Sequence, residues 1–183
     1  MTQMLLRTRI NGRDYALDIE QHQTLAEVLR DRLHLTGTKV SCDVQVCGAC
    51  TVLLQGLPVS ACTILAYEAR GREVLTVEGL ASPEGELHPL QQAFIEENAF
   101  QCGFCTPGML LAARSLLDHQ PDATDAEIVE YMEGNICRCT GYRPILAAIR
   151  RARVILSAAK DPLLVRSQPE ADSSASPQND LRA

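Results

Sequence analysis

The chain has 183 residues, of which 46% are hydrophobic, and a formal net charge of −6. This length gives room for one large or two small domains with packed cores. The acidic balance argues against a nucleic-acid partner, because phosphate binding requires a basic surface. No apolar run reaches the roughly 18 residues of a membrane span. The first residues carry neither an apolar signal core nor a twin-arginine pair, so we expect a cytoplasmic protein.

Two strands and a short helix are the first elements that the sequence predicts. Residues 4–10 favour a strand, Asn11-Gly12 is a strong hairpin turn, and residues 14–19 are expected to form the return strand. Thr24 and Glu27 then have the spacing of a capping box, in which the two side chains satisfy free backbone N–H groups. This box predicts a short helix that runs through Leu33.

The chain has eight cysteines, and they fall into two groups of four. The first group consists of Cys42, Cys47, Cys50 and Cys62. Four residues separate its first two members and two residues separate the next pair, which is the plant-type ferredoxin spacing for a 2Fe-2S cluster. Gly48 keeps a side chain out of the way where backbone N–H groups must turn toward sulfur. We therefore predict that this group binds one 2Fe-2S cluster.

Disulfides and zinc are the two alternatives for these cysteines. An even number of cysteines is common in secreted disulfide-bonded proteins, but nothing in this sequence indicates export. A pair of cysteines two residues apart can also bind zinc. However, the triplet that begins at Cys42 does not have a usual zinc-ribbon spacing.

Further strands are expected at residues 51–55, 57–60 and 74–77. Residues 1–79 would then form a small mixed sheet with one helix across it, which is the first domain. Residues 80–87 combine Pro, Gly and Ser and are the predicted linker.

Beyond the linker, residues 88–159 are predicted to form a helical domain. We expect helices at residues 88–98, 107–119, 125–133 and 143–158. The third begins with another capping box, formed by Thr124 and Glu127. Two of the helices carry apolar stripes that we expect in the core, formed by Leu110, Ala113, Leu117, Ile145, Ile149, Ala152 and Leu156. Residues 160–183 lose this periodicity and are expected to be a disordered tail.

The second group of cysteines lies between these helices and consists of Cys102, Cys105, Cys137 and Cys139. Each pair precedes an expected helix start: Thr106 is the predicted N-cap with Pro107 as the first helical residue, and Thr140 with Gly141 occupies the corresponding place. Helix N-termini that face a cluster would stabilise its negative charge, and Arg138 would add to this effect. We predict a second 2Fe-2S cluster here, within a four-helix bundle.

No catalytic machinery is recognisable elsewhere in the sequence. It contains no Ser-His-Asp arrangement, phosphate loop or dinucleotide fingerprint. The four histidines share no metal-ligand spacing with each other or with the cysteines. Substrate chemistry is therefore expected on another chain.

Taken together, the cysteine triplet, the segment QCGFCTPG and the segment CRCTGY resemble the small iron–sulfur subunit of the molybdenum hydroxylases. This family includes xanthine dehydrogenase, aldehyde oxidoreductase and carbon monoxide dehydrogenase. The resemblance covers about residues 3 to 158, with Gln45 standing where many members have Gly. It implies an α+β fold, with an N-terminal β-grasp 2Fe-2S ferredoxin-like domain followed by an all-α four-helix-bundle 2Fe-2S domain.

The resemblance also implies a function. Such a subunit relays single electrons from the molybdopterin centre of a large subunit, through two 2Fe-2S clusters, to FAD on a medium subunit or to another acceptor. A dimer of heterotrimers is the assembly that the family suggests. Gln101 is similar to a family residue that hydrogen-bonds the pterin, and Cys139 to the cluster ligand nearest it. The cluster on Cys42 and its group would lie nearer the flavin.

Two other classes of protein are weighed against this one. A free-standing two-cluster ferredoxin would also be acidic, but it has no need of the helical half with its own cysteine motifs. A zinc-stabilised scaffold would be colourless, whereas two iron clusters make a protein brown.

Overall fold

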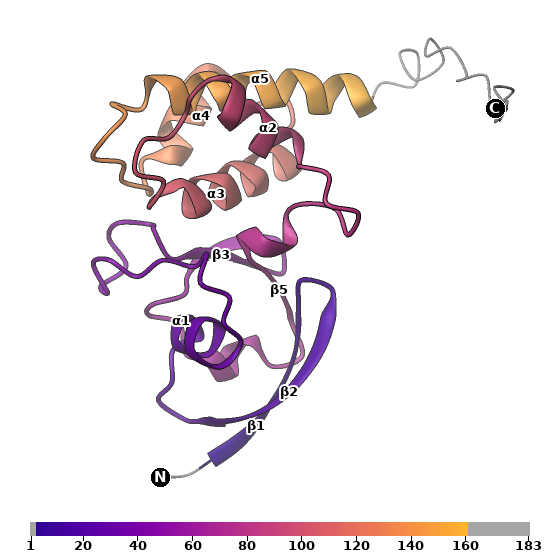
Figure 1. Cartoon of the computed structure of the whole chain (residues 1–183), viewed down its shortest axis with the longest axis vertical. Coiled ribbons are helices and arrows are strands. Elements are labelled where there is room, and N and C mark those ends of the chain that lie inside the picture. The colour runs from indigo at the N-terminus through magenta and orange to yellow at the C-terminus, as the bar shows by residue number, and fades with distance from the viewer. Residues whose placement is uncertain (1–2, 161–183) are drawn as a thin grey trace, which may run out of the picture.

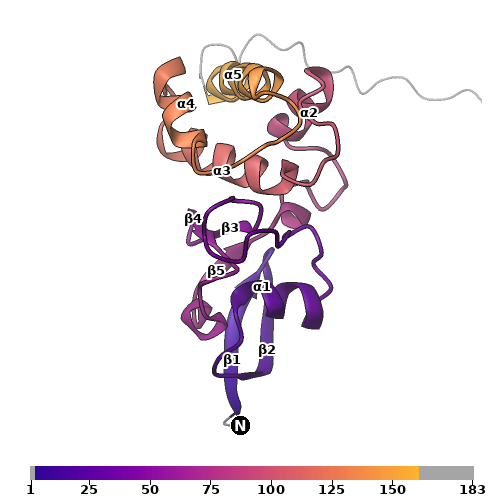
Figure 2. The same cartoon turned by 90° about the vertical axis from the view of Figure 1, so that its left-hand side faces the viewer.

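The computed structural model describes residues 3–160, and these form two halves. Strands and one short helix make up the N-terminal half, and four longer helices lie above it (Figure 1). The view turned by 90° shows the same two layers, with α3 nearest the sheet half (Figure 2). This is an α+β arrangement, as the sequence predicts. None of the helices in residues 3–160 combines the length and the apolar content that a membrane-spanning segment needs.

A five-stranded mixed sheet organises the N-terminal half. Its strands are β1 (Gln3–Ile10), β2 (Arg13–Glu20), β3 (Thr51–Leu54), β4 (Leu57–Ser60) and β5 (Glu73–Leu75), in the spatial order β2-β1-β5-β3-β4. Strand β1 pairs with β5 in parallel, and every other neighbouring pair is antiparallel. The predicted hairpin turn is present: Asn11 and Gly12 have φ values of 50° and 76°, which a two-residue hairpin requires.

The first helix begins as predicted and then changes character. The Thr24 hydroxyl accepts from the Glu27 N–H at 3.2 Å, and the Glu27 carboxylate accepts from the Thr24 N–H at 2.7 Å. After a single α-helical turn, α1 (Leu25–Glu27), the chain widens into a π-helix, η1 (Val28–Arg32). Val28 packs with Leu6 in one core cluster, while Leu29 packs in another. Successive residues of this helix therefore bury their side chains in different clusters.

The helical half contains α2 (Pro89–Glu96), α3 (Thr106–His119), α4 (Asp125–Met132) and α5 (Arg143–Lys160). The second capping box, formed by Thr124 and Glu127, is present at the start of α4. Both predicted apolar stripes face the core: six of their members, Leu110, Ala113, Leu117, Ile145, Ile149 and Ala152, are buried, and Leu156 packs against them partly buried.

Strand β5 is shorter than predicted for a physical reason. It ends at Leu75, and Val77–Gly79 forms a 3-10 helix, η3, instead of extending the strand. Thr76 is held by Asn11, whose side chain accepts from the Thr76 N–H at 2.8 Å and donates to its hydroxyl at 2.9 Å. These side-chain bonds take the place of the strand ladder.

The remaining boundaries differ little from the predictions. Helix α2 stops at Glu96, and Asn98 with a φ of 51° ends the chain's helical path. A further 3-10 helix, η2 (Ala66–Ala69), precedes β5. Residues 80–87 contain neither helix nor strand. The predicted tail at residues 160–183 lies outside the described residues, apart from Lys160 at the end of α5.

Candidate metal centres

The first group of cysteines lies on the loop between η1 and β3 and just after β4. Cys42 and Cys47 are partly exposed, whereas Cys50 and Cys62 are buried at the base of the loop. Between Cys42 and Cys50 the loop curves tightly because three residues adopt the left-handed conformation: Asp43, Gln45 and Gly48, with φ values of 58°, 58° and 68°. Tight curvature of this kind turns successive N–H groups toward one side.

Those N–H groups converge on Cys42. The backbone N–H groups of Val44, Val46 and Cys47 lie 3.5, 3.3 and 3.3 Å from its sulfur. Hydrogen bonds from Val44 first, then from Val46 and Cys47, lower the pKa of Cys42 to about 6. Because donors that face a thiol favour its charged form, Cys42 is prepared as the thiolate that iron binds.

The four thiols of this group are arranged as two neighbouring pairs. Cys42 lies beside Cys47, and Cys50 lies beside Cys62. Burial, together with these neighbouring thiols, raises the pKa of Cys50 to about 12. A buried thiol of this kind becomes an anion only when a positive partner such as a metal ion replaces its proton.

The second group converges on a single cavity. All four of its cysteines line a cavity of about 270 Å³, together with Cys47 from the first group; they are Cys102, Cys105, Cys137 and Cys139. Here too the thiols form pairs. The sulfur of Cys139 lies 3.6 Å from that of Cys102, and Cys105 lies beside Cys137.

The pKa directions in this cavity follow from burial and from the neighbouring sulfurs. Burial first, and the adjacent Cys137, raise the pKa of Cys105 to about 12. Burial also acts to raise the pKa of Cys137, but hydrogen bonds from the Thr140 hydroxyl and from backbone N–H groups outweigh it and lower the value. The contact with Cys102 raises the pKa of Cys139. When a metal ion binds such a pair of thiols, it displaces their protons.

The start of α3 corrects one prediction. Cys105, not Thr106, occupies the N-cap position of α3, because the helix begins one residue earlier than predicted, at Thr106. Thr106 and Pro107 are therefore the first two helical residues, and the Thr106 hydroxyl is buried with no partner among the described residues. Helix α3 still begins directly after a cysteine, as expected.

Helix α5 starts at Arg143, as predicted, but Thr140 is not its cap. Gly141 and Tyr142, with φ values of 66° and 67°, separate Thr140 from the first helical residue. Thr140 instead contacts the sulfur of Cys137 at 3.2 Å, and its hydroxyl accepts from the Tyr142 N–H at 3.2 Å. Arg138 is exposed at the wall of the cavity.

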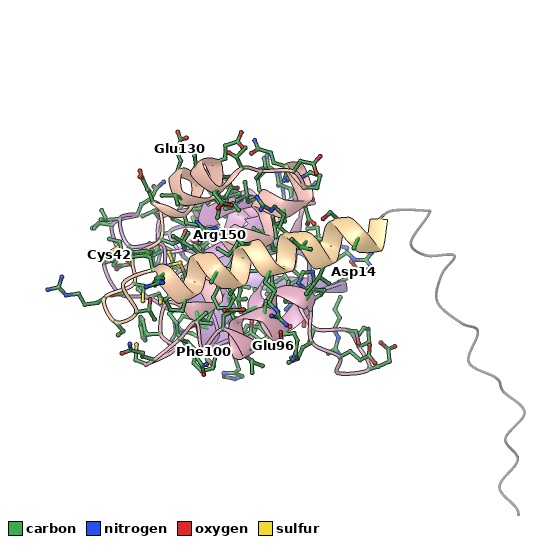
Figure 3. All side chains as sticks on the ribbon, turned by 90° about the horizontal axis from the view of Figure 1, so that it is seen from above. Asp14, Cys42, Glu96, Phe100, Glu130 and Arg150 are labelled. Carbon is green, nitrogen blue, oxygen red and sulfur yellow. The ribbon has the colours of Figure 1, made fainter. Side chains whose placement is uncertain are left out.

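Gln101 lies on the outer side of the second group. It is exposed, and its side-chain amide donates to the carbonyl of Cys139 at 3.2 Å. Cys102 and Cys139 are the exposed members of the group, and three apolar side chains stand exposed nearby in the sequence: Phe100, Phe104 and Ile136. Seen from above in Figure 3, Phe100 lies near Glu96 at one edge of the molecule and Cys42 at another.

Sequence reasoning missed two residues that organise this region. The phenol oxygen of Tyr142 accepts from the N–H of Cys137 at 3.0 Å and donates to the carbonyl of Asn135 at 3.4 Å. The side chain of Asn135 is buried and reaches the first cysteine loop. The only available signal was their position on either side of the Cys-x-Cys segment.

The thiol pairs fit iron–sulfur clusters better than a single ion. Within residues 3–160, no three Cys, His, Asp or Glu side chains converge as one bound ion would require. In a 2Fe-2S cluster four thiolates hold two irons, so that each iron takes two of them. Two pairs in each group match this requirement.

Comparison with known proteins agrees with this geometry. Residues 8–75 match the family model described as a 2Fe-2S iron–sulfur cluster binding domain, and residues 76–150 match the model of a [2Fe-2S] binding domain. The 6-hydroxypseudooxynicotine dehydrogenase complex subunit beta of Paenarthrobacter nicotinovorans is 48% identical over 81% of this chain and 92% of its own length. The nicotinate dehydrogenase small FeS subunit of Eubacterium barkeri is 45% identical over 83% of this chain and 96% of its own length.

The chain belongs to the family of small iron–sulfur subunits of the molybdenum hydroxylases. It is an iron–sulfur subunit of an oxidoreductase, and its role is electron transfer. A solved structure agrees: a chain of quinoline 2-oxidoreductase from Pseudomonas putida 86 superposes with a TM-score of 0.81 at 44% identity, covering 86% of this chain and 97% of that one. The resemblance seen in the sequence motifs is thus confirmed.

Proposed function

We propose that this chain transfers single electrons from a molybdopterin centre on a large partner subunit, through two 2Fe-2S clusters, to FAD or another acceptor. The observation that carries this proposal is the arrangement of all eight cysteines as two groups of paired thiols. A 2Fe-2S cluster accepts and releases one electron at a time, and its potential depends on hydrogen bonds and burial around the sulfurs. The protein supplies these surroundings and the distances between the groups.

The pairs suggest how each group would hold its cluster. In the first group, Cys42 with Cys47 would bind one iron and Cys50 with Cys62 the other. In the second group, Cys102 with Cys139 would bind one iron and Cys105 with Cys137 the other. The support is the contact between the sulfurs of Cys102 and Cys139, and the neighbouring thiols in the other pairs.

The second group is the one that would face the molybdopterin. Its exposed ligands, Cys102 and Cys139, leave one side of the cluster close to the surface. Gln101 lies there with its amide on the carbonyl of Cys139, so its side chain is held at the edge where a pterin could be bound. Phe104 and Ile136, 44% and 47% exposed, give this edge the apolar character of a subunit contact.

The first group would face the electron acceptor. Val44 and Val46 on its loop are 65% and 60% exposed. Removing such apolar side chains from water is favourable, so their exposure is typical of a surface that a partner covers. We assign this loop to contact with a medium subunit that carries FAD. With a large molybdenum subunit, the three chains would form a heterotrimer, and two heterotrimers a dimer, in the cytoplasm.

The domain division follows from the same reasoning. Residues 1–79 would be a β-grasp ferredoxin-like domain, residues 80–87 a linker, and residues 88–159 an all-α four-helix-bundle domain, followed by a tail at residues 160–183. Mixed pairing in the sheet, four helices after it, and the absence of regular structure at residues 80–87 support this division.

The test is the metal and flavin content of the complex that co-purifies with the chain from its native host. We expect about four irons per molybdenum, because two 2Fe-2S clusters contain four, and FAD if a flavin subunit follows. Four irons without molybdenum and without a partner would contradict the proposal and make the chain a free-standing ferredoxin. Zinc in place of iron would contradict both.

A further inference from the structure

Asn135 is a buried polar residue that joins the two halves of the molecule. Only 6% of its surface is exposed, and it lies two positions before Cys137 in the loop after α4. Its side-chain amide donates to the carbonyl of Gly48 at 2.9 Å and to the hydroxyl of Thr51 at 3.3 Å. A buried amide is retained when its hydrogen bonds are satisfied, since an unpaired one is costly.

Both acceptors lie next to cysteines of the first group. Gly48 follows Cys47 directly, and Thr51 follows Cys50. Beside these side-chain bonds runs a backbone bond, in which the N–H of Ile136 donates to the carbonyl of Cys47 at 2.9 Å. Ile136 is bonded to Cys137, so this hydrogen bond is a short bridge from one group to the other. The loops at residues 41–50 and 134–142 lie on the same side of the molecule in both views (Figures 1 and 2).

The Gly48 carbonyl is closely packed by residues of both halves. A methyl group at Gly48 would lie 2.5 Å from the carbonyl of Gly134 and 2.6 Å from the amide of Asn135. A methyl group at Gly108 on α3 would collide with the carbonyl of Gly48 itself. The hydroxyl of Thr51 donates to the same carbonyl at 2.8 Å. Side chains from both halves therefore fix one peptide group in the first loop.

We propose that Asn135 is a positioning residue for electron transfer between the two cysteine groups. Its amide holds the Gly48 carbonyl, and thereby keeps the preceding carbonyl of Cys47 in place against the N–H of Ile136. The proposal rests on the proposed function, because it concerns two clusters bound at these groups. A cluster at the second group would give up one electron and a cluster at the first would take it up, whereas Asn135 exchanges neither an electron nor a proton.

The test compares Asn135→Asp with Asn98→Asp in the purified complex. The substitution at Asn135 keeps the shape of the side chain, but the carboxylate that it introduces accepts hydrogen bonds and cannot donate to the Gly48 carbonyl. Asn98 is exposed in the same half and serves as the matched control. Two readouts follow the bridge directly: the magnetic interaction between the two reduced clusters by electron paramagnetic resonance, and hydrogen exchange at the Ile136 N–H.

We expect Asn135→Asp to keep about four irons, to change the magnetic interaction, and to slow electron transfer from the second group to the first. Hydrogen exchange at the Ile136 N–H should accelerate about tenfold, because the free energy that protects it would fall by about the contribution of one hydrogen bond. Asn98→Asp should match the wild type in every readout. A lower melting temperature with unchanged magnetic interaction and unchanged exchange would show that Asn135 only packs the halves together, and would overturn the proposal.

Gly108→Ala tests the position of the Gly48 carbonyl from helix α3. This variant tests the proposal if the Asn135→Asp complex does not assemble. Its methyl group would displace the Gly48 carbonyl while Asn135 remains. We expect the same two changes in this variant, and wild-type behaviour would overturn the proposal. A wild-type complex without molybdenum would defeat the proposed function alone, since exchange at Ile136 and the interaction between the chain's own clusters would still test Asn135.

Discussion

The two cysteine loops solve the same problem with different parts of the chain. The first is an irregular loop whose left-handed residues turn three N–H groups onto Cys42. The second uses helix ends, with Cys105 at the N-cap of α3 and Tyr142 holding the backbone of Cys137. An anionic group can thus be stabilised by backbone donors from a loop or from a helix start.

Burial separates the two loops further. Cys50 and Cys62 belong to a core cluster of the sheet half, together with Val52. Cys102 and Cys139 are exposed. The difference teaches that two ligands of the first group serve as core residues of the sheet half and none is fully exposed, whereas two ligands of the second group are exposed and accessible to a partner.

Replacing one cysteine ligand in each loop should have the largest effect and should separate the two loops most clearly. We expect Cys62→Ala and Cys139→Ala each to lose about two of the four irons, because each removes a ligand of one cluster. Cys62→Ala should in addition lower the free energy of unfolding by about 1–3 kcal/mol, since it removes a buried side chain. Cys139→Ala should leave the first cluster intact while slowing reduction of the acceptor. Iron analysis, paramagnetic resonance and steady-state kinetics measure these effects.

Loss of both clusters in Cys139→Ala would mean that the halves do not assemble independently. Normal turnover in that variant would contradict the assigned route. In either case the contrast between a core loop and an exposed loop would need revision.

The glycines that follow Cys47 and Cys102 offer a matched pair of substitutions. Gly48 and Gly103 both have positive φ, at 68° and 77°, but only Gly48 is enclosed; nothing lies within 4 Å of a methyl group at Gly103. Gly103→Ala should cost about 1–2 kcal/mol of stability for its backbone conformation. Gly48→Ala should cost about 2–4 kcal/mol, because a steric clash is added. Denaturant unfolding measures the free energy of unfolding of both variants. Equal losses would show that the first loop shifts to accommodate the added methyl group.

One histidine in the helical half makes stability depend on pH. His88 caps α2, with its ring Nδ1 accepting from the N–H of Leu90 at 3.2 Å. Burial, and then the charge of Arg114, lower the pKa of His88 to about 4 from 6.5. As the pH falls from 6.5 to 4, the unfolded chain takes up this proton first, so the folded state loses stability across that window. We expect a loss of about 1 kcal/mol, reduced by the partial exposure of the ring.

Urea unfolding at about pH 7.5 and about pH 5 would measure this loss. His88→Asn keeps a capping side chain that does not titrate, so it should remove this part of the pH dependence. His22→Asn in the sheet half is the control, because His22 is 69% exposed, and it should behave as the wild type. An unchanged pH dependence in His88→Asn would contradict the prediction.

The two capping boxes give the smallest contrast. Thr24→Ala and Thr124→Ala should each cost about 1 kcal/mol. After Thr24→Ala the short helix α1 should stay in place, because Leu25 and Ala26 are buried. Helix α4 buries only Ile128 and Met132, so Thr124→Ala should fray its first turn. Hydrogen exchange over each helix distinguishes the two, and fraying confined to α1 would reverse the expected order.

Patterns that are local in the chain were predictable from the sequence. The hairpin at Asn11-Gly12, both capping boxes and the apolar stripes of α3 and α5 depend on residues at most a few turns apart, and the structure contains them. The cysteine spacings likewise indicated which family the chain belongs to. The N-cap at Thr106 was wrong because Thr106 is itself the first helical residue, a one-residue shift that no local pattern specifies.

Tertiary structure alone decided which distant groups meet. Asn11 stops β5 by bonding to Thr76, 65 positions away, and Asn135 reaches Gly48 from a distance of 87 positions. The pairing of Cys102 with Cys139 spans 37 positions in the same way. Cysteine spacing determined the chemistry that this chain can perform, since ligand type and local geometry are encoded within short segments. The coupling between its two halves was decided only on folding, because contacts between distant segments leave no periodic trace in the sequence.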